Sequence, residues 1–201
     1  METILVIKND VLSEIFKNKT GFIKDDGEFK TSELFDEKNC WFGPREYLEN
    51  DPSFRQFIPY IILKSGDRIF YYRRGKKGSE QRLHDLYSVG FGGHINVMDA
   101  VTNDERLSVI DTVEESIFRE IHEELDLDML PIINDLKYIG YIIDNTNDVG
   151  KVHLAIVCMV EIDEDTPIST ENCIKEIQLD NIQNVKKLNL ESWSNLCIDH
   201  I

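Results

Sequence analysis

The chain has 201 residues, a length that suits one domain with a sizeable hydrophobic core, or one domain with an extension. Its hydrophobic content of 41% and charged content of 30% are typical of folded globular proteins and exclude a disordered chain. The net charge of −16 argues against general nucleic-acid binding and against an anionic membrane surface as the partner. It does not exclude a nucleotide substrate, because metal ions can screen phosphate from carboxylate.

Cysteine usage and the start of the chain indicate the compartment. The cysteines are widely scattered, with no CxxC pair and no matching histidine spacing, so a zinc site is not expected: Cys40, Cys158, Cys173 and Cys197. They are typical of reduced thiols. The start of the chain is too short and too acidic for a signal peptide, and no apolar run reaches membrane-spanning length. We therefore expect a soluble cytoplasmic protein with no membrane partner.

The first 53 residues favour less regular structure than the rest of the chain. After a β-prone run at residues 4–7, glycines and prolines interrupt the pattern from about residue 20 onwards. Trp41, Phe42 and Tyr47 indicate that this stretch packs against another part of the molecule. We interpret residues 1–53 as an N-terminal extension packed on a main domain that spans residues 54–201.

The main domain carries strand and turn signals around one central helix. Residues 57–63 and 68–73 predict a β-hairpin, in which Pro59 favours an edge position or a strand start. The other expected elements are a second hairpin, a further strand and a C-terminal helix, at residues 136–143 with 152–160, 174–188 and 191–201. This arrangement indicates a mixed α/β fold.

A basic loop follows the first hairpin of this otherwise acidic chain. Glycine-flanked cations can bind phosphate through their side chains and through exposed backbone N–H groups. A solvated hairpin end explains the same pattern equally well. The cations of this loop are Arg73, Arg74, Lys76, Lys77 and Arg82. The loop lacks the spacing of a P-loop.

The segment 111–127 predicts an amphipathic helix. It follows a glycine-rich turn at residues 90–93, called the glycine turn below, and an inserted loop at residues 97–110. Asp111 is the expected N-cap, and Glu114 completes a capping-box pattern. The apolar stripe expected to pack on the core consists of Ile117, Phe118, Ile121 and Leu125.

Three carboxylates gather at the edge of that stripe. Glu120, Glu123 and Glu124 stand at i, i+3 and i+4, which places them together on one side of the helix. No lysine stands at the partner spacing, and like charges at this spacing cost up to about 0.5 kcal/mol each. Hard divalent metals prefer oxygen ligands of this kind. The alternative is a solvated acidic face, which is common in a chain this acidic.

The glycine turn and the helix together resemble the signature of the Nudix hydrolases, G-x5-E-x7-R-E-U-x-E-E-x-G-U, in which U is an apolar aliphatic residue. Gly93 matches the opening glycine, residues 119–124 match R-E-U-x-E-E in full, and Leu127 fills the final U. The spacer after Gly93 is longer by about a dozen residues, which is consistent with an inserted loop. Asp111 stands eight residues before Arg119, where the family has its first glutamate, and Asp126 replaces the late glycine.

The resemblance covers about residues 55–200 and implies an α/β/α sandwich with a mixed β-sheet. It also implies a bound Mg2+ or Mn2+, held by the carboxylates of Glu120, Glu123 and Glu124 and the carbonyl of Gly93. Arg119 would pair with an acid and hold the helix against the loop. The implied reaction is hydrolysis of a diphosphate linkage in a nucleoside diphosphate joined to another group.

The same resemblance suggests roles for two further groups of residues. The first group supplies a general base, which is Glu120 or one of four later acids: Glu161, Glu164, Glu171 and Glu176. For each of these four later acids, the alternative is a solvated surface residue. The second group contacts the phosphate or the leaving group and consists of Arg73, Arg74 and Arg82. The expected partner is thus a small-molecule nucleotide or another diphosphate.

Two other functions remain open at this level. One is a regulatory module that binds a nucleotide with little turnover, for which the aspartates at 111 and 126 leave room. The other is isomerisation of an isoprenoid diphosphate, which requires a catalytic cysteine, and no cysteine here lies in a recognisable motif. Apolar residues of the N-terminal extension could also form a homodimer interface.

Overall fold

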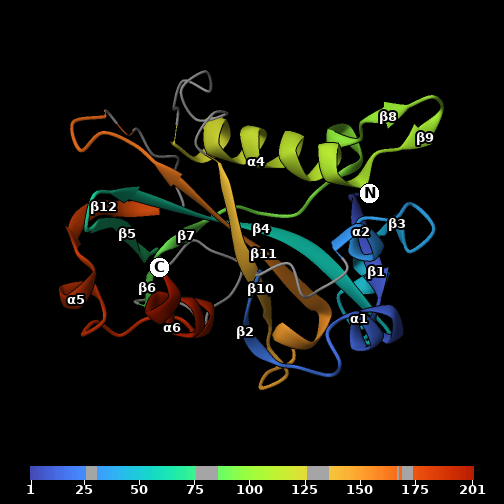
Figure 1. The fold of residues 1–201 in the computed structure, drawn as a ribbon, viewed down its shortest axis with the longest axis horizontal. Helices are drawn as coiled ribbons and strands as arrows, with labels where there is room; N and C mark the ends of the chain where they lie inside the picture. Colours follow the sequence, from blue (N-terminus) through green and yellow to red (C-terminus); the bar gives the residue numbers. More distant parts are fainter. Residues whose placement is uncertain (26–30, 76–85, 126–135, 167, 169–173) are drawn as a thin grey trace.

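The computed structural model describes residues 1–25, 31–75, 86–125, 136–166, 168 and 174–201. A mixed sheet forms the middle layer of the molecule. Helix α4 (Val109–Leu125) covers one face of the sheet, and the short helices α5 (Ile182–Val185) and α6 (Ser192–Cys197) cover the other face (Figure 1). The predicted α/β/α sandwich is confirmed. No helix in these ranges is long and apolar enough to cross a membrane.

Six strands form the main path of the sheet. Their order is β12 (Ile174–Asn181), β5 (Arg68–Arg74), β4 (Phe54–Ser65), β11 (His153–Glu161), β10 (Lys137–Ile143) and β2 (Gly21–Lys24). Strands β4 and β11 pair in parallel, and the other neighbours on this path are antiparallel. Both predicted hairpins are confirmed, as β4–β5 and β10–β11. The predicted C-terminal helix is α6, which continues as the 3-10 turn η4 (Ile198–His200).

Pro59 lies inside the central strand β4, so the expectation of an edge position or a strand start is wrong. On one side, residues 56–64 of β4 pair with β11. On the other side, β1 (Thr3–Lys8) pairs with residues 54–56, and β7 (Gly90–Phe91) pairs with residues 61–62. Pro59 lies between these two pairings, where its missing N–H donor does not interrupt a ladder of hydrogen bonds.

The first 53 residues add strands to the same sheet. Strand β1 pairs with β4 and with β3 (Cys40–Pro44), and β2 extends the sheet beyond β10. The helices of this part are α1 (Asn9–Ile15), α2 (Thr31–Leu34) and α3 (Arg45–Leu48). Trp41 packs edge-on against Phe54 of β4, with the ring centroids 5.1 Å apart. This packing agrees with the expected docking of the aromatic residues, and the domain limit at residue 53 stays a prediction.

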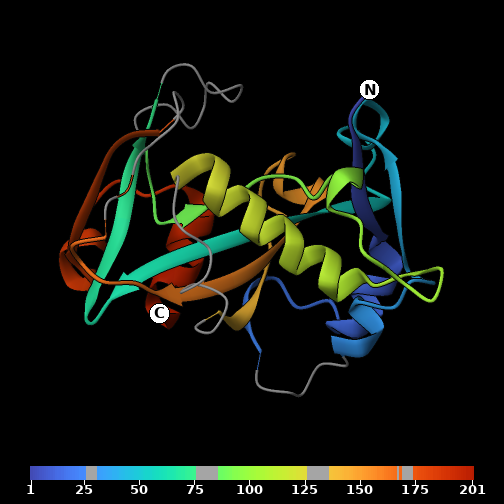
Figure 2. The same cartoon turned by 90° about the horizontal axis from the view of Figure 1, so that it is seen from above.

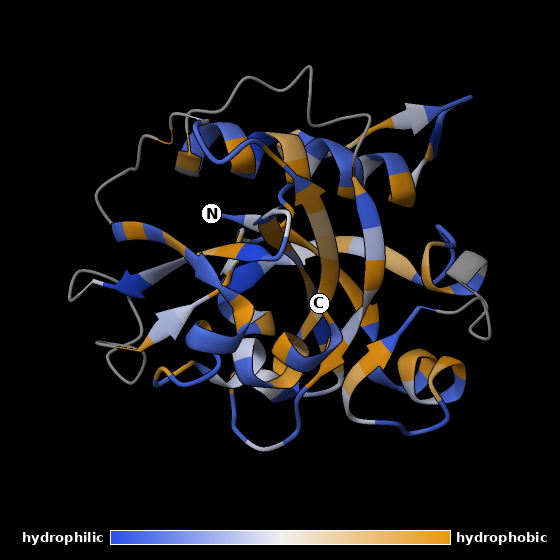
Figure 3. Ribbon diagram, turned by 60° about the vertical axis from the view of Figure 1, so that its left-hand side comes forward, coloured by the Kyte–Doolittle hydropathy of each residue, from blue (hydrophilic) through white to orange (hydrophobic). Residues whose placement is uncertain are grey.

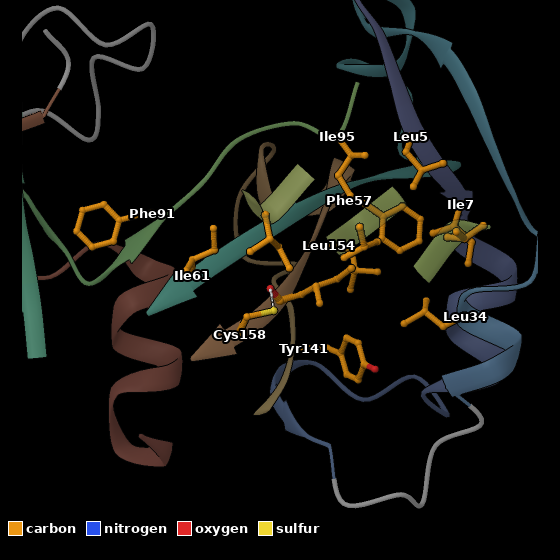
Figure 4. Packing of buried hydrophobic residues seen from close by; sticks show 14 of the residues in the cluster. Leu5, Ile7, Leu34, Phe57, Ile61, Phe91, Ile95, Tyr141, Leu154 and Cys158 are labelled. Carbon is orange, nitrogen blue, oxygen red and sulfur yellow. Dashed lines mark hydrogen bonds between the residues drawn. The ribbon is translucent and has the colours of Figure 1, made fainter. Parts of the chain in front are cut away.

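Hydrophobic cores lie on both faces of the sheet. The core under α4 joins β1 to the central strands, as Leu5, Phe57 and Leu154 illustrate in Figure 4. Helix α4 contributes one apolar residue every four positions, each at most 1% exposed: Val109, Val113, Ile117, Ile121 and Leu125. In Figure 3, hydrophobic and hydrophilic segments alternate along α4. Phe118, which the sequence placed in the stripe, is half-buried beside it.

The segment between the glycine turn and α4 contains a 3-10 turn and a small hairpin. These are η2 (Val97–Asp99) and the strands β8 (Thr102–Asn103) and β9 (Arg106–Leu107), which project beyond the start of α4 (Figure 2). Helix α4 begins at Val109, so the prediction that Asp111 caps it is wrong. Asp111 lies in the first turn and accepts hydrogen bonds from the Ser108 hydroxyl at 2.6 Å and from Asn103 at 2.9 Å.

Candidate active site

The glycine turn runs beside β4 and brings Gly93 to α4. Gly92 has a φ of +134°, a conformation that residues with a side chain rarely adopt. A Cβ atom at position 92 would lie 2.2 Å from the carbonyl oxygen of Pro59. The backbone can therefore follow this path only with glycine at position 92.

Glu120 projects from α4 onto Gly93. A Cβ atom on Gly93 would lie 2.8 Å from Oε1 and 3.0 Å from Oε2 of Glu120, so the carboxylate occupies the space that a side chain at position 93 would need. Glu120 is 7% exposed. Burial raises the pKa of its carboxyl, and the adjacent Arg119 guanidinium partly opposes this effect. The buried carboxylate of Glu120 thus packs directly against the backbone of Gly93.

Arg119 forms hydrogen bonds to three acidic side chains and to the backbone directly after the glycine turn. Its Nε donates to Asp99 Oδ1 at 2.7 Å, and its Nη2 donates to Asp99 Oδ2 and to the carbonyl of His94, both at 3.0 Å. Its Nη1 donates to Glu120 at 2.7 Å and to Glu123 at 2.9 Å. The hydrogen bonds to Asp99 raise the pKa of the guanidinium, so Arg119 stays charged. Arg119 thus connects α4 to Asp99 and to the glycine turn, and its role in a metal site stays a prediction.

The acid that pairs with Arg119 is Asp99, not Asp111. Asp99 is 2% exposed and ends the turn η2. It stands six residues after Gly93, which is the G-x5-E spacing of the signature with aspartate in place of glutamate. The inserted residues therefore follow this acid instead of preceding it. Counting forward from Gly93 gives Asp99, whereas counting backward from Arg119 gives Asp111, and the hydrogen bonds of Arg119 select Asp99.

His94 fixes the turn through its side chain. Its Nε2 lies 2.8 Å from Gln56 Oε1 and 3.1 Å from His153 Nε2. His153 Nδ1 donates to the carbonyl of Val149 at 2.7 Å, which leaves its Nε2 as an acceptor for His94. Burial, followed by the charge of Arg45, lowers the pKa of His94 to about 3. His94 is therefore a neutral packing residue that holds the backbone next to Gly93.

Two of the three arginines predicted to contact phosphate lie in the described part of the chain, and their role stays a prediction. Arg73 is exposed near the end of β5. Arg74 forms an ion pair with Glu191, with Nε 2.7 Å from Oε2. Arg82 lies outside the described residues, as do the loop lysines at positions 76 and 77.

Two of the four later acids are engaged at the β4–β5 turn. Glu161 accepts a hydrogen bond from the N–H of Gly66 at 2.6 Å, and Glu164 pairs with Arg68. Glu176 is exposed on β12, and Glu171 lies outside the described residues. Among the described candidates for the general base, Glu120 is the one that contacts the glycine turn.

The oxygen atoms around Gly93 fit a hard divalent cation. Glu120, Glu123 and the Gly93 peptide supply carboxylate and carbonyl oxygens, which Mg2+ and Mn2+ prefer. Glu123 has 55% of its side chain exposed, so its carboxylate is open to solvent. Within the described residues, no group of three or more His, Cys, Asp or Glu side chains is arranged as a metal site. The third acid of the predicted set, Glu124, has its side chain outside that description.

Gly93→Ala is expected to weaken Mn2+ binding about tenfold to a hundredfold, the range seen when groups that orient metal ligands are removed. The new Cβ would displace the Glu120 carboxylate, which the bond to Arg119 prevents from moving freely. Electron paramagnetic resonance of free Mn2+ measures the affinity. His122→Ala, an exposed position on the same helix, is the control. Equal Mn2+ affinity in Gly93→Ala and the control would rule out Gly93 as part of the metal site.

Comparisons with known proteins show which proteins share this sequence and this fold. No family model matches the chain. Protein YmaB of Bacillus subtilis (strain 168) is 34% identical over 163 residues, which cover 75% of this chain and 73% of YmaB. The crystal structure of Tm1382, a candidate Nudix hydrolase, aligns with a TM-score of 0.79 and 26% identity, over 98% of this chain and 97% of Tm1382. The Nudix domain of Shewanella oneidensis NrtR, solved with ADP ribose, shares the fold, with a TM-score of 0.54, 13% identity and coverage of 79% and 95%.

Proposed function

This chain belongs to the Nudix hydrolase family, and we propose that it is a metal-dependent hydrolase that cleaves a diphosphate linkage in a nucleoside diphosphate derivative or a related small molecule. One observation carries the proposal. The buried Glu120 carboxylate packs on Gly93, and Arg119 fixes it there by binding Asp99 and the His94 carbonyl. This arrangement brings together the glycine turn and the acidic helix, which are the two parts of the signature.

The proposed ligands of Mg2+ or Mn2+ are the carboxylates of Glu120, Glu123 and Glu124 and the carbonyl of Gly93. When bound, such a cation neutralises charge on a diphosphate and lowers the pKa of a water molecule that attacks phosphorus. Arg119 contributes by orienting two of these carboxylates. Its contacts to Asp99 do not involve the proposed ligands, so they would persist when a metal binds.

Glu120 is the proposed general base. It contacts the glycine turn, and burial raises the pKa of its carboxyl, which brings the proton affinity of this group closer to that needed for proton transfer near neutral pH. Arg73, Arg74 and Arg82 are proposed to bind the phosphate or the leaving group. Guanidinium groups suit this role because their paired N–H donors match phosphate oxygens.

A panel of nucleotide derivatives with Mg2+ or Mn2+ tests the proposal. ADP ribose belongs in the panel, because the related NrtR Nudix domain was solved with it. Phosphorus NMR is expected to show cleavage of at least one compound and none after chelation of the metal. Glu123→Gln and Glu124→Gln should abolish cleavage, whereas Glu115→Gln, an exposed position on the same helix, should not. Full activity in both glutamine variants would contradict the metal assignment.

The two alternative functions differ from hydrolysis in ways that the assay and the structure can distinguish. Tight nucleotide binding without any phosphorus-containing product would favour a regulatory module. Isomerisation of an isoprenoid diphosphate requires a reactive thiol. The described cysteines, Cys40, Cys158 and Cys197, are all buried, and burial raises the pKa of each thiol. None of these three suits that chemistry. Homodimer formation stays a prediction.

A further inference from the structure

A buried carboxylate that the proposed reaction does not use lies directly before α6. Glu191 is 4% exposed. Its Oε2 accepts from Arg74 Nε at 2.7 Å, and its Oε1 accepts from the Ser88 hydroxyl at 2.7 Å and from the Tyr60 hydroxyl at 3.2 Å. Buried carboxylates are costly unless they are paired in this way. Glu191 lies outside the signature, and the metal site does not require it.

Glu191 and its hydrogen-bond partners form a cluster that fixes the start of the glycine turn. The Ser88 hydroxyl, which contacts Glu191, also lies 3.0 Å from the carbonyl oxygen of Gly90. The hydroxyl of Ser194 accepts from the N–H of Val89 at 3.0 Å and lies 2.7 Å from the Tyr60 hydroxyl. Glu191 and its neighbours thus fix residues 88–90, three residues before the proposed metal ligand at position 93.

The same cluster also orients Arg74. Glu191 engages Nε, and the guanidinium carbon lies 5.8 Å from the centre of the Tyr72 ring. The Tyr72 hydroxyl donates to the Gly90 carbonyl at 3.2 Å, so Arg74 is connected to the same turn a second time. Across the described part of the chain, the Nη1 and Nη2 atoms of Arg74 have no hydrogen-bond partner. The side chain of Arg74 is 36% exposed, so the guanidinium is accessible to solvent.

We propose that Glu191 is a positioning residue for substrate binding, which holds Arg74 by Nε so that its two Nη groups bind the phosphate oxygens of the substrate. A guanidinium engaged at Nε still presents two terminal groups that can donate to an anion. Because Glu191 also fixes residues 88–90, it sets the position of Arg74 relative to the glycine turn. The inference rests on the proposed function, from which it takes a diphosphate as the ligand.

A double-mutant cycle on binding of inorganic pyrophosphate, measured by calorimetry with Mg2+, tests this role. Arg74→Gln is expected to weaken binding about tenfold to a hundredfold, the range for hydrogen bonds to a charged group. Glu191→Gln should weaken binding several-fold in the presence of Arg74 and should have no further effect in the Arg74→Gln background. A residue with only a structural role would lower the melting temperature without this coupling in affinity.

The matched control is Glu49→Gln, which also removes a carboxylate that binds an arginine Nε at 2.7 Å, but at the exposed C-terminal end of helix α3. It should leave pyrophosphate binding unchanged. If Glu191→Gln does not fold, Arg74→Lys provides the test, because lysine keeps the charge but cannot bind Glu191 and offer two further guanidinium donors. Arg74→Lys should then bind nearly as weakly as Arg74→Gln.

Three results would overturn the inference: unchanged affinity in Arg74→Gln, equal weakening by Glu191→Gln in both backgrounds, or full affinity in Arg74→Lys. Because pyrophosphate binding is measured without turnover, failure of the proposed hydrolysis is a separate result. A protein that cleaves no compound but shows the Arg74–Glu191 coupling would lose the hydrolase assignment and keep this anion site.

Discussion

Arg119→Met is expected to lower the free energy of unfolding by about 3–5 kcal/mol, the usual cost of removing one partner from a buried ion pair. Asp99 is 2% exposed and receives two hydrogen bonds from Arg119, so the variant leaves a buried carboxylate without its cation. The carbonyl of His94 and the carboxylate of Glu120 lose a donor in the same change. Urea denaturation followed by circular dichroism measures the loss.

Two further variants show whether the buried charge is the cause. Asp99→Asn combined with Arg119→Met removes that charge and should recover part of the lost stability. Arg106→Met breaks an exposed contact to Glu37, in which 79% of the arginine side chain is exposed, and should be nearly neutral. If Arg119→Met were as stable as Arg106→Met, Arg119 would not be the residue that fixes the site.

Glu120→Gln is expected to reduce kcat about a thousandfold, within the range for loss of a general base or of a main electrostatic group. The amide has nearly the same shape as the carboxylate but lacks its charge and its basicity. Because burial already disfavours the charged form of Glu120, the neutral variant should fold. The measurement is kcat at saturating Mg2+ and substrate.

The stability of the same variant separates function from folding. Glu120→Gln should lose much less stability than Arg119→Met, because Arg119 keeps both bonds to Asp99. Glu115→Gln, on the exposed side of α4, should retain wild-type kcat. Wild-type kcat in Glu120→Gln would remove Glu120 from the site.

The hairpins and the central helix could be predicted because their signals are local. Turn residues between two β-prone runs identified β4–β5 and β10–β11. The apolar stripe of α4 was correct at Ile117, Ile121 and Leu125, which are fully buried. It was less accurate at Phe118, which is half-buried. The buried residues of α4 recur every four positions, and Phe118 lies about 100° around the helix from Ile117, at the edge of that stripe.

The partner of Arg119 could not be predicted by counting along the chain from one end. Asp111 has the expected spacing to Arg119, and Asp99 has the expected spacing to Gly93. The sequence alone does not show on which side of the acid the insertion lies. The fold decides in favour of Asp99, which η2 places under the guanidinium.

Long-range partners are the second group that local reasoning missed. Arg74 and Glu191 are separated by 117 residues, and His94 and His153 by 59. Their proximity depends on the order of strands in the sheet and on the return of the C-terminal segment beside β6 (Tyr87–Ser88). Periodicity and turn chemistry carry no information about such pairs.

Hydrolysis in 18O-labelled water with Mg2+ shows whether water attacks a phosphorus atom of the diphosphate linkage. The first substrate to assay is the compound of the nucleotide panel that the protein cleaves fastest. We expect one phosphorus-containing product to carry a single 18O bound to phosphorus, because water attacks a phosphorus atom of the diphosphate linkage. Chelation of the metal and Glu120→Gln should both suppress the labelled product. Products whose phosphorus carries no label would contradict attack of water on phosphorus, and labelling that persists in Glu120→Gln would contradict the role of Glu120.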